Sequence, residues 1–389
     1  MTGRIVEEVK GKKYKVIIEA GKDPSTGKRK RIIRRVTGRK PDAEKLCADI
    51  IRQLEQGTYI EPNKITVAEY MEHWLKTYAV NLAPSTHAGY KRIVKSHIIL
   101  ELGHVPLSKL QPMQIQEYYT ARLREGRRDG AGGLSATTVR QHHAVLREAL
   151  QHAVKWQLIY RNPADLTEPP TPAEAEIFPL ELEHLDELLA SAVGSRDEHL
   201  YVVAAYTGMR EGELLAITWV NVDLVDPPCC RVRQTVGYIN GKGFVFRPTA
   251  KHKKARREIP LPDIAVDALR KQWKMLAEEK FQAGPKYDKT LNLVFPNTVG
   301  KPLDPSDMTG RFKELAVKAG FPKIRFHDLR HTHATMLLKQ GTHPKIVQER
   351  LGHQTIGMTM DKYSHVTKSM QKDAVDKLNE YLKSRKLHT

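Results

Sequence analysis

Five residues in the C-terminal half of the sequence are of types that can act on a phosphodiester. Arg210 follows a Thr-Gly pair in AAYTGMREGELL, and His327 and Arg330 lie three residues apart in FHDLRHTHAT, where a helix would place them on one face. The stretch LGHQTIGMTMDKYSHV adds His353 after a Leu-Gly turn and Tyr363 ten residues later. Taken singly, each is ordinary, because an arginine is more often a surface charge and the chain has fourteen tyrosines.

As a set, these residues suit the attack of a phenol on a phosphodiester. The reaction puts negative charge on the non-bridging oxygens of a pentacoordinate phosphorus, and two planar guanidinium groups can match that charge in place of a metal. A phenol with a pKa of about 10 is protonated at neutral pH, so one group must take its proton and another must protonate the leaving oxygen. Histidine can fill these roles, and so can a lysine from the segment KHKKARR at 251–257, although that segment alone could equally be a solvated basic loop.

The same inventory predicts no cofactor and no metal. A phosphotyrosine link would retain the energy of the phosphodiester, so a free 5′-hydroxyl could reseal the strand without ATP, and the sequence has no GxxxxGK[ST] loop. His331 and His333 do not share a helical face, and no cysteine or carboxylate completes a ligand set around them.

The composition points to a polyanionic partner. Lys and Arg exceed Asp and Glu by 19 in 389 residues, and the sequence pI is about 9.6, which favours nucleic acid over a merely soluble basic protein. The length predicts two or three domains. Three cysteines without a CxxC spacing fit a reducing compartment. The sequence shows no apolar signal segment and no membrane-length run, so we expect a cytoplasmic, nucleoid-associated protein without a membrane partner.

The N-terminal 60 residues carry the densest positive charge. The β-prone runs KYKVIIEA at 13–20 and KRKRIIRRV at 28–36 predict a hairpin, and a helical pattern over 43–54 predicts one helix behind it. Nine basic residues and one acid lie between positions 22 and 40, on a ribbon slim enough for a major groove. The alternative is a solvated basic edge that blocks strand pairing. The candidate DNA contacts here are Arg29, Arg31 and Arg34.

Residues 64–165 predict a unit of four helices. Thr66 and Glu69 form a capping box before the first helix, and helical patterns follow at 85–99, 112–125 and 135–157. Hydroxyls and cations near helix N-termini suit phosphate contacts, although the same residue types are also ordinary caps. The candidate DNA contacts here are Ser85, Thr86, Lys91, Thr137 and Arg140.

A third region begins after the proline-rich segment 161–176, which predicts an extended linker. Its patterns predict helices near 180–193, 197–207, 262–279, 305–319, 327–340, 344–351 and 367–384, and strands near 231–236, 244–247, 257–260 and 292–295. The predicted fold is multidomain and mainly α with small β: an N-terminal small sheet plus helix, a helical domain, and a mixed α+β domain that carries the reactive residues.

The order Arg210, HDLR, LGH and Tyr363 resembles the tyrosine recombinase family, specifically the integrases of phages and integrative elements. TGMREGELL is similar to the first arginine motif of that family, HDLRHTHAT to its His-x-x-Arg motif, and LGHQTIGMTMDKYSHV to its His-to-Tyr motif, including Gly352, Thr359 and His365. The joint order of these blocks over roughly 206–366 is far more specific than any one of them.

The resemblance implies a role for each matching residue. Tyr363 would be the nucleophile, and Arg210 and Arg330 would hold the scissile phosphate. His327 and His353 would assist proton transfer and phosphate binding. Lys251 would be the general acid, and it is preferred over Lys253 and Lys254 because of its spacing from Ile259, Pro260 and Leu261. Glu213 would orient the first arginine.

The resemblance also implies an organisation and a set of partners. Residues 1–60 resemble an arm-type DNA-binding domain, 64–165 a SAM-like core-binding domain, and 175–389 a catalytic domain. The expected activity is site-specific recombination that integrates or excises a prophage or other mobile element through a 3′-phosphotyrosine and a Holliday junction. Expected partners are double-stranded DNA attachment sites and a homotetramer on DNA, with an excisionase and a host DNA-bending protein as accessory candidates. The helix expected at 367–384 would dock on a neighbouring protomer or pack on its own domain.

Two other functions fit the same residues. A type IB topoisomerase would use similar chemistry to nick and reseal without exchanging partners, but it would have little need for a separate basic N-terminal ribbon. A non-catalytic DNA-binding regulator would not need all six polar positions.

Overall fold

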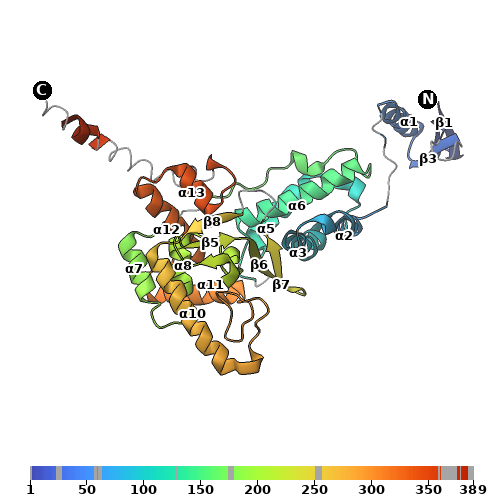
Figure 1. Ribbon diagram of the computed structural model, residues 1–389. Helices are drawn as coiled ribbons and strands as arrows, with labels where there is room; N and C mark the ends of the chain where they lie inside the picture. Colours follow the sequence, from blue (N-terminus) through green and yellow to red (C-terminus); the bar gives the residue numbers. More distant parts are fainter. Residues whose placement is uncertain are drawn as a thin grey trace. The chain divides into compact units, whose positions relative to one another are not determined.

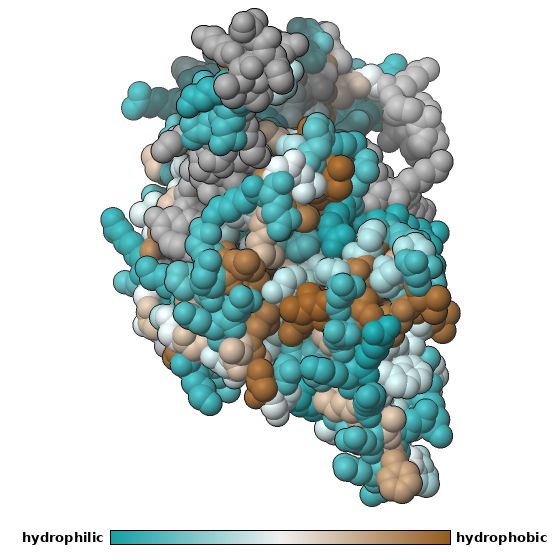
Figure 2. Space-filling model, turned by 60° about the vertical axis from the view of Figure 1, so that its left-hand side comes forward, coloured by the Kyte–Doolittle hydropathy of each residue, from teal (hydrophilic) through white to brown (hydrophobic). Residues whose placement is uncertain are grey.

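The computed structural model describes residues 2–22, 29–56, 59, 64–127, 130–173, 179–249, 256–357, 360, 375–376 and 378–383. The chain divides into two compact units, Met1–Glu174 and Ala175–Thr389, and Figure 1 labels most of their elements. Among the described residues, no helix combines the length and the apolar composition needed to cross a bilayer. On the face drawn in Figure 2, hydrophilic residues predominate and apolar residues gather in a few small patches.

The chain begins with an antiparallel three-stranded sheet and one helix. The elements are β1 (Gly3–Val9), β2 (Lys13–Lys22), β3 (Arg29–Thr37) and α1 (Lys40–Glu55), with strand order β1-β2-β3. Tyr14, Val16 and Ile18 alternate along β2 and are buried with residues of α1, as the period of a strand requires. The predicted hairpin and helix are confirmed. The sequence reading missed β1, whose adjacent Ile5 and Val6 give no alternating pattern.

The rest of the first unit is helical. Its elements are α2 (Val67–Thr77), α3 (Pro84–Ile93), α4 (Ile99–Leu102), α5 (Pro112–Glu125) and α6 (Ala136–Lys155), and a π-helical turn at Val94–Ile98 joins α3 to α4. The predicted capping box is present, since the N–H of Glu69 donates to Thr66 Oγ1 at 3.2 Å and the N–H of Thr66 donates to the Glu69 carboxylate at 2.8 Å. Trp74, Tyr70 and Leu146 lie in the core of these helices, which confirms the predicted helical unit.

The second unit combines helices with two small sheets. Its helices are α7 (Leu182–Ala190), α8 (Glu198–Thr207), α9 (Glu211–Leu214), α10 (Asp263–Ala283), α11 (Pro305–Lys318), α12 (Phe326–Lys339) and α13 (Pro344–Leu351). Its strands are β4 (Val222–Asp223), β5 (Cys229–Val232), β6 (Gln234–Ile239), β7 (Gly243–Pro248) and β8 (Arg257–Pro260). The strands form one sheet of order β4-β5-β8 and a separate β6-β7 hairpin. In Figure 1, α8 lies among the other helices of this unit, where it contacts α10 and α12.

One predicted strand of this unit is wrong. Residues 292–295 form no strand, and Leu293 makes only an isolated bridge to Thr218. Leu293, Val294 and Phe295 are all buried, so the apolar run reflects burial on every side rather than pairing in a sheet. The predicted helix at 367–384 lies mostly outside the described residues, of which 375–376 and 378–383 are helical.

Candidate active site

The C-terminal end of α13 accepts hydrogen bonds from three arginines. The last carbonyls of a helix have no partner within the helix, and they lie at the negative end of its dipole. Three consecutive carbonyls here each accept from a guanidinium of a different element. Arg257 Nε donates to the carbonyl of Arg350 at 2.6 Å, Arg330 Nη2 to that of Leu351 at 2.7 Å, and Arg210 Nη2 to that of Gly352 at 2.9 Å. One helix end therefore gathers side chains from β8, α12 and the start of α9.

Gly352 allows this arrangement because it ends α13 in the left-handed conformation, with φ 68°. A Cβ at this position would lie 2.9 Å from Arg257 Nη1, so a larger residue would displace that guanidinium. The chain turns directly into His353, which is 5% exposed. The backbone of His353 is fixed by Gln348, which accepts from its N–H and donates to its carbonyl, both at 3.1 Å.

Arg330 lies in α12 and joins the ends of two other helices. Its side chain is buried, and Nη1 donates to the carbonyl of Gly208 at 2.6 Å while Nη2 bonds to α13. Gly208 ends α8 with φ 64°, and a Cβ there would lie 2.7 Å from the ring of His333. Arg330 thus fixes the C-terminal ends of α8 and α13 relative to each other.

Arg210 is held at the N-terminus of α9 but remains accessible. It is the N-cap residue: its N–H donates to the Glu213 carboxylate at 3.0 Å, and its Nη1 donates to the same carboxylate at 2.9 Å. Its side chain is 39% exposed. A guanidinium has five N–H donors in a planar fork, so Arg210 can be anchored through Glu213 and Gly352 and still present an edge to an anion.

Glu213 is shared by two arginines. In addition to Arg210, Arg257 donates to both of its carboxylate oxygens, at 3.1 and 2.7 Å. Burial alone would raise the pKa of Glu213, but the hydrogen bonds and charge of Arg257, followed by those of Arg210, outweigh it and lower the pKa to about 2. The carboxylate is therefore ionised at any physiological pH.

Arg350 and His333 extend the network behind α13. Arg350 Nε donates to His333 Nε2 at 2.9 Å, and its two Nη atoms donate to the carbonyls of Pro260 and Tyr206, at 3.0 and 3.2 Å. Burial, reinforced by the charge of Arg350, lowers the pKa of His333 to about 3, so the imidazole is neutral and can accept this bond. The described part of the chain contains no cluster of three His, Cys, Asp or Glu residues that could hold a metal ion.

The charges of this network are unbalanced in favour of an anionic ligand. The network contains four guanidinium groups, those of Arg210, Arg257, Arg330 and Arg350, and one carboxylate, that of Glu213. Of the four, only Arg210 and Arg257 bond to that carboxylate, whereas Arg330 and Arg350 bond to backbone carbonyls and to His333. A partly buried excess of guanidinium charge is complementary to a group with several charged oxygens, such as a phosphodiester.

The structure brings together three of the six residues expected to act on the phosphate. Arg210, Arg330 and His353 converge on the end of α13. His327 lies one turn before Arg330 at the start of α12, is exposed, and has its ring edge-on to His331 with centroids 4.9 Å apart. The remaining expected residues, Lys251 and Tyr363, and the motif residues Thr359 and His365, lie outside the described residues.

Sequence reasoning missed Arg257 and Arg350. Arg257 belongs to a run of basic residues that reads as a loop, but in β8 it alternates with Glu258 so that Arg257 and Ile259 point inward. An arginine at the inward position of a short strand, two residues before a buried isoleucine, is the signal that was available. Arg350 had no such signal, because a basic residue in the last turn of a helix is common.

The candidate DNA contacts of the N-terminal sheet divide between two faces of β3. Arg29 and Arg31 are exposed, and Arg31 pairs with Glu19 at 3.3 Å. Arg34 lies on the opposite face, on the same side as buried Ile32, and donates to the hydroxyl of Tyr59 at 2.6 Å. The face of Arg29 and Arg31 is therefore the better placed for a DNA groove.

The candidates in the helical part are all exposed, and all but Lys91, which lies in the last turn of α3, are near the starts of helices. The N-cap residues are Ala83 for α3 and Ser135 for α6, whose hydroxyl accepts from the N–H of Thr138 at 3.2 Å. The candidates therefore lie inside the helices and do not occupy the N-cap positions. They are Ser85, Thr86 and Lys91 on α3 and Thr137 and Arg140 on α6.

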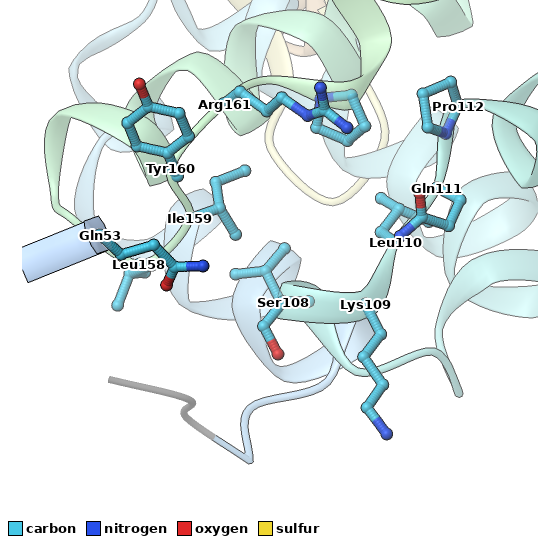
Figure 3. A pocket seen from close by; sticks show the side chains of 12 residues that line it. Gln53, Ser108, Lys109, Leu110, Gln111, Pro112, Leu158, Ile159, Tyr160 and Arg161 are labelled. Carbon is cyan, nitrogen blue, oxygen red and sulfur yellow. The ribbon is translucent and has the colours of Figure 1, made fainter. Parts of the chain in front are cut away.

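The first unit contains a hollow of about 580 Å³, drawn in Figure 3, whose lining includes none of these candidate DNA contacts. Residues 107–112 and 158–161 contribute most of its lining, including the cations Lys109 and Arg161. Its described lining has no histidine and no carboxylate, the side chains that most often act as general acids and bases.

Two models of known protein families match this sequence, and the longer match covers most of the second unit, which carries the candidate site. A model described as "Phage integrase family" matches residues 180–370, and one described as "Phage integrase, N-terminal SAM-like domain" matches residues 66–122. The chain belongs to the phage integrase family of tyrosine recombinases. By family it is a tyrosine-type site-specific recombinase, which confirms the resemblance seen in its motifs.

Relatives of this integrase-family protein match nearly its whole length. It is 28% identical to "Tyrosine recombinase XerC-like" of Caldanaerobacter subterraneus subsp. tengcongensis, over 94% of this chain and 96% of the relative. It is 25% identical to "ICEBs1 integrase" of Bacillus subtilis, over 97% and 100%. Among solved structures, the Tn1549 transposon integrase in complex with a circular intermediate DNA has a TM-score of 0.68 at 21% identity, over 81% of this chain and 99% of that one. The last likeness confirms the predicted multidomain, mainly α fold.

Proposed function

We propose that this recombinase integrates or excises a mobile element or prophage by cleaving and rejoining DNA through a 3′-phosphotyrosine intermediate. The observation that carries the proposal is the convergence of Arg210, Arg330 and His353 on the end of α13, in a network whose guanidiniums outnumber its one carboxylate, Glu213. That arrangement supplies fixed donors for a phosphate without a metal.

The roles follow from the charge that develops during strand cleavage. The phenolic oxygen of Tyr363 attacks the scissile phosphorus, a bond to the 3′-phosphate forms, and the bond to the 5′-oxygen breaks. Arg210 and Arg330 stabilise the non-bridging oxygens. The phenolic proton passes to a histidine, His353 or His327, and Lys251 protonates the leaving 5′-oxygen. Attack by a 5′-hydroxyl of the partner strand reverses these steps and reseals the DNA.

The first unit would supply DNA recognition. We assign residues 1–60 to arm-type binding, 64–165 to core binding and 175–389 to catalysis. The partner is double-stranded DNA at attachment sites, as the relatives solved with DNA suggest. We further propose that a homotetramer exchanges strands through a Holliday junction on cytoplasmic, nucleoid DNA, with an excisionase and a host DNA-bending protein as accessory factors.

The test is covalent trapping. The protein is incubated with a duplex that carries the DNA flanking the element and a nick beside the cleavage point, so that the released fragment diffuses away and cannot religate. Denaturing electrophoresis should then show a protein–DNA adduct that Tyr363→Phe abolishes. Tyr381→Phe is the matched control, because Tyr381 is an exposed tyrosine of the C-terminal region outside the motif, and it should retain the adduct.

Two outcomes would contradict the proposal. An adduct formed equally by Tyr363→Phe would show that another residue is the nucleophile. Relaxation of supercoiled DNA without any exchange between two attachment sites would favour a topoisomerase of the same chemistry.

A further inference from the structure

Arg257 is a buried arginine whose described hydrogen bonds all connect parts of the site. It is 9% exposed, and it donates from Nη1 and Nη2 to Glu213 and from Nε to the carbonyl of Arg350. Glu213 in turn holds Arg210, and the same helix end holds Arg330 and leads into His353. One side chain therefore lies at the junction between α9, β8 and α13.

We propose that Arg257 is a positioning residue for recombination, which sets Arg210 relative to Arg330 and His353 by holding the Glu213 carboxylate and the end of α13 at once. The inference rests on the proposed function. Arg257 itself does not need to touch DNA, because its donors are directed at the protein.

The geometry requires a guanidinium rather than any cation. The bidentate bond to Glu213 fixes the plane of the group, and Nε then points at the helix end, so the three bonds define one orientation. A lysine would retain the charge but has a single nitrogen, so it could satisfy Glu213 or the carbonyl of Arg350 without fixing their separation. The strand helps to fix this orientation of the guanidinium, since β8 pairs with β5 and directs Arg257 inward.

Removing Arg257 should also change the protonation of Glu213. The charged groups that face this carboxylate are Arg210 at the start of α9 and Arg257 from β8, and Arg257 also bonds to the backbone of Arg350 in α13. Arg257 is the largest influence that lowers the pKa of Glu213, and burial opposes it. Without Arg257 the pKa of Glu213 rises, so cleavage should acquire a dependence on an ionised carboxylate that the wild-type protein does not show.

The experiment compares single-turnover cleavage of the nicked duplex by wild type, Arg257→Met and Arg257→Lys between pH 5 and 8. Arg257→Met should cleave about 10²-fold more slowly at pH 7, as expected when catalytic groups are misplaced by about 1 Å. The loss should deepen as the pH falls. The cleavage rate of Arg257→Lys should lie between those of wild type and Arg257→Met. In the double variant Arg257→Met/Glu213→Gln, which has no carboxylate to protonate, the added pH dependence should disappear.

Arg196→Met is a matched control. Arg196 makes the same three-bond pattern in the same unit, with two bonds to Glu279 at 2.7 and 2.9 Å and one to the carbonyl of Pro296 at 2.7 Å. Its loss should also lower the unfolding temperature, by less than Arg257→Met because the Arg196 side chain is 28% exposed, but it should leave the cleavage rate and its pH profile unchanged. DNA binding by gel shift should remain within a few-fold for all variants.

The outcomes separate the two proposals. If the wild type forms an adduct and Arg257→Met cleaves equally fast with the same pH profile, the positioning role is overturned while the proposed function stands. If Arg196→Met and Arg257→Met lose cleavage alike and with unchanged pH profiles, Arg257 is only structural and the inference is again overturned. If the wild type forms no adduct, the proposed function and this inference both fall. Should Arg257→Met not fold, Arg257→Lys is judged by the same criteria.

Discussion

The guanidinium of Arg210 donates to the carbonyl oxygen of Gly352 at 2.9 Å, across 142 positions of the chain. This bond ties the start of α9 to the end of α13, so the first arginine and His353 are fixed by the same helix end. The arginines are therefore oriented by protein groups before DNA binds, which is the preorganisation that electrostatic catalysis requires.

Replacing either arginine that we propose binds the scissile phosphate should impair cleavage far more than DNA binding. We expect Arg210→Ala and Arg330→Ala each to slow adduct formation by on the order of 10²-fold or more, as for the loss of one transition-state donor. DNA affinity should stay nearly intact, because many other cations contribute to it. Single-turnover cleavage and gel-shift titrations on the same duplex measure the two effects, and equal losses in both would contradict a catalytic role.

The same two variants should differ in stability. Arg330 is 3% exposed and is bonded to the carbonyls of Gly208 and Leu351, so its truncation removes a donor from two helix ends and should destabilise the protein by about 1–3 kcal/mol. Arg210 is 39% exposed, and water can replace it. Thermal unfolding should therefore show a clear drop for Arg330→Ala and a smaller one for Arg210→Ala; the reverse order would mean that the burial difference does not govern stability here.

Gly352→Ala should disturb the site as well as the fold. The left-handed backbone alone costs roughly 1–2 kcal/mol with a Cβ, and the added carbon would lie 2.9 Å from Arg257 Nη1. Gly341→Ala is the control, since Gly341 has φ 81° but nothing within 4 Å of its added Cβ. Both variants should lower the unfolding temperature, but only Gly352→Ala should also slow cleavage; comparable cleavage by the two would show that Arg257 can shift without consequence.

Much of the fold could be predicted because its signals are local. The capping box of Thr66 and Glu69 indicates where a helix begins, and the glycines after α8 and α13 indicate where those helices end. The Thr-Gly and Leu-Gly pairs likewise placed Arg210 and His353 at helix ends, where the structure has them. The strand predicted at residues 292–295 is wrong because pairing in a sheet is not a local property. An apolar run indicates burial but does not show whether a neighbouring strand exists.

The connections within the site could not be predicted, because they depend on long-range contacts. Nothing near Arg257 in the sequence reveals that Glu213 lies opposite it, 44 positions earlier, or that it also reaches the end of α13. The sequence identifies the residues that can act on a phosphate. The residues that hold them in place become visible only once α9, β8 and α13 are brought together.

His333 should make the stability of the second unit depend on pH. Its pKa falls from 6.5 to about 3 on folding, owing to burial and then to Arg350, so the unfolded chain takes up a proton that the folded chain does not. The contribution of neutral His333 is complete above pH 6.5 and is lost as the pH falls toward 3, by about 2 kcal/mol at pH 5. The unfolding temperature should therefore drop between pH 7 and pH 5.

His333→Gln isolates this effect, because a glutamine oxygen can replace Nε2 as the acceptor for Arg350. The variant should lose less stability than the wild type over the same pH range. His199 of the same unit, whose pKa is also lowered, chiefly by burial, remains in both proteins and cancels in the comparison. Parallel curves for the two proteins would contradict the assignment.

The two faces of β3 should contribute differently to DNA binding. Arg29 is exposed on the face away from α1, whereas Arg34 lies on the opposite face and is bonded to Tyr59. If the N-terminal sheet enters a groove with its exposed face, Arg29→Ala should remove one phosphate contact, which would reduce the slope of log K against log salt by about 0.9. Arg34→Ala should leave the slope unchanged.

Fluorescence anisotropy on a duplex of element-flanking DNA, between roughly 50 and 200 mM salt, measures both slopes. Equal slopes for Arg29→Ala and the wild type would mean that this face does not contact the backbone, and a larger effect of Arg34→Ala would place the DNA on the other side of the sheet.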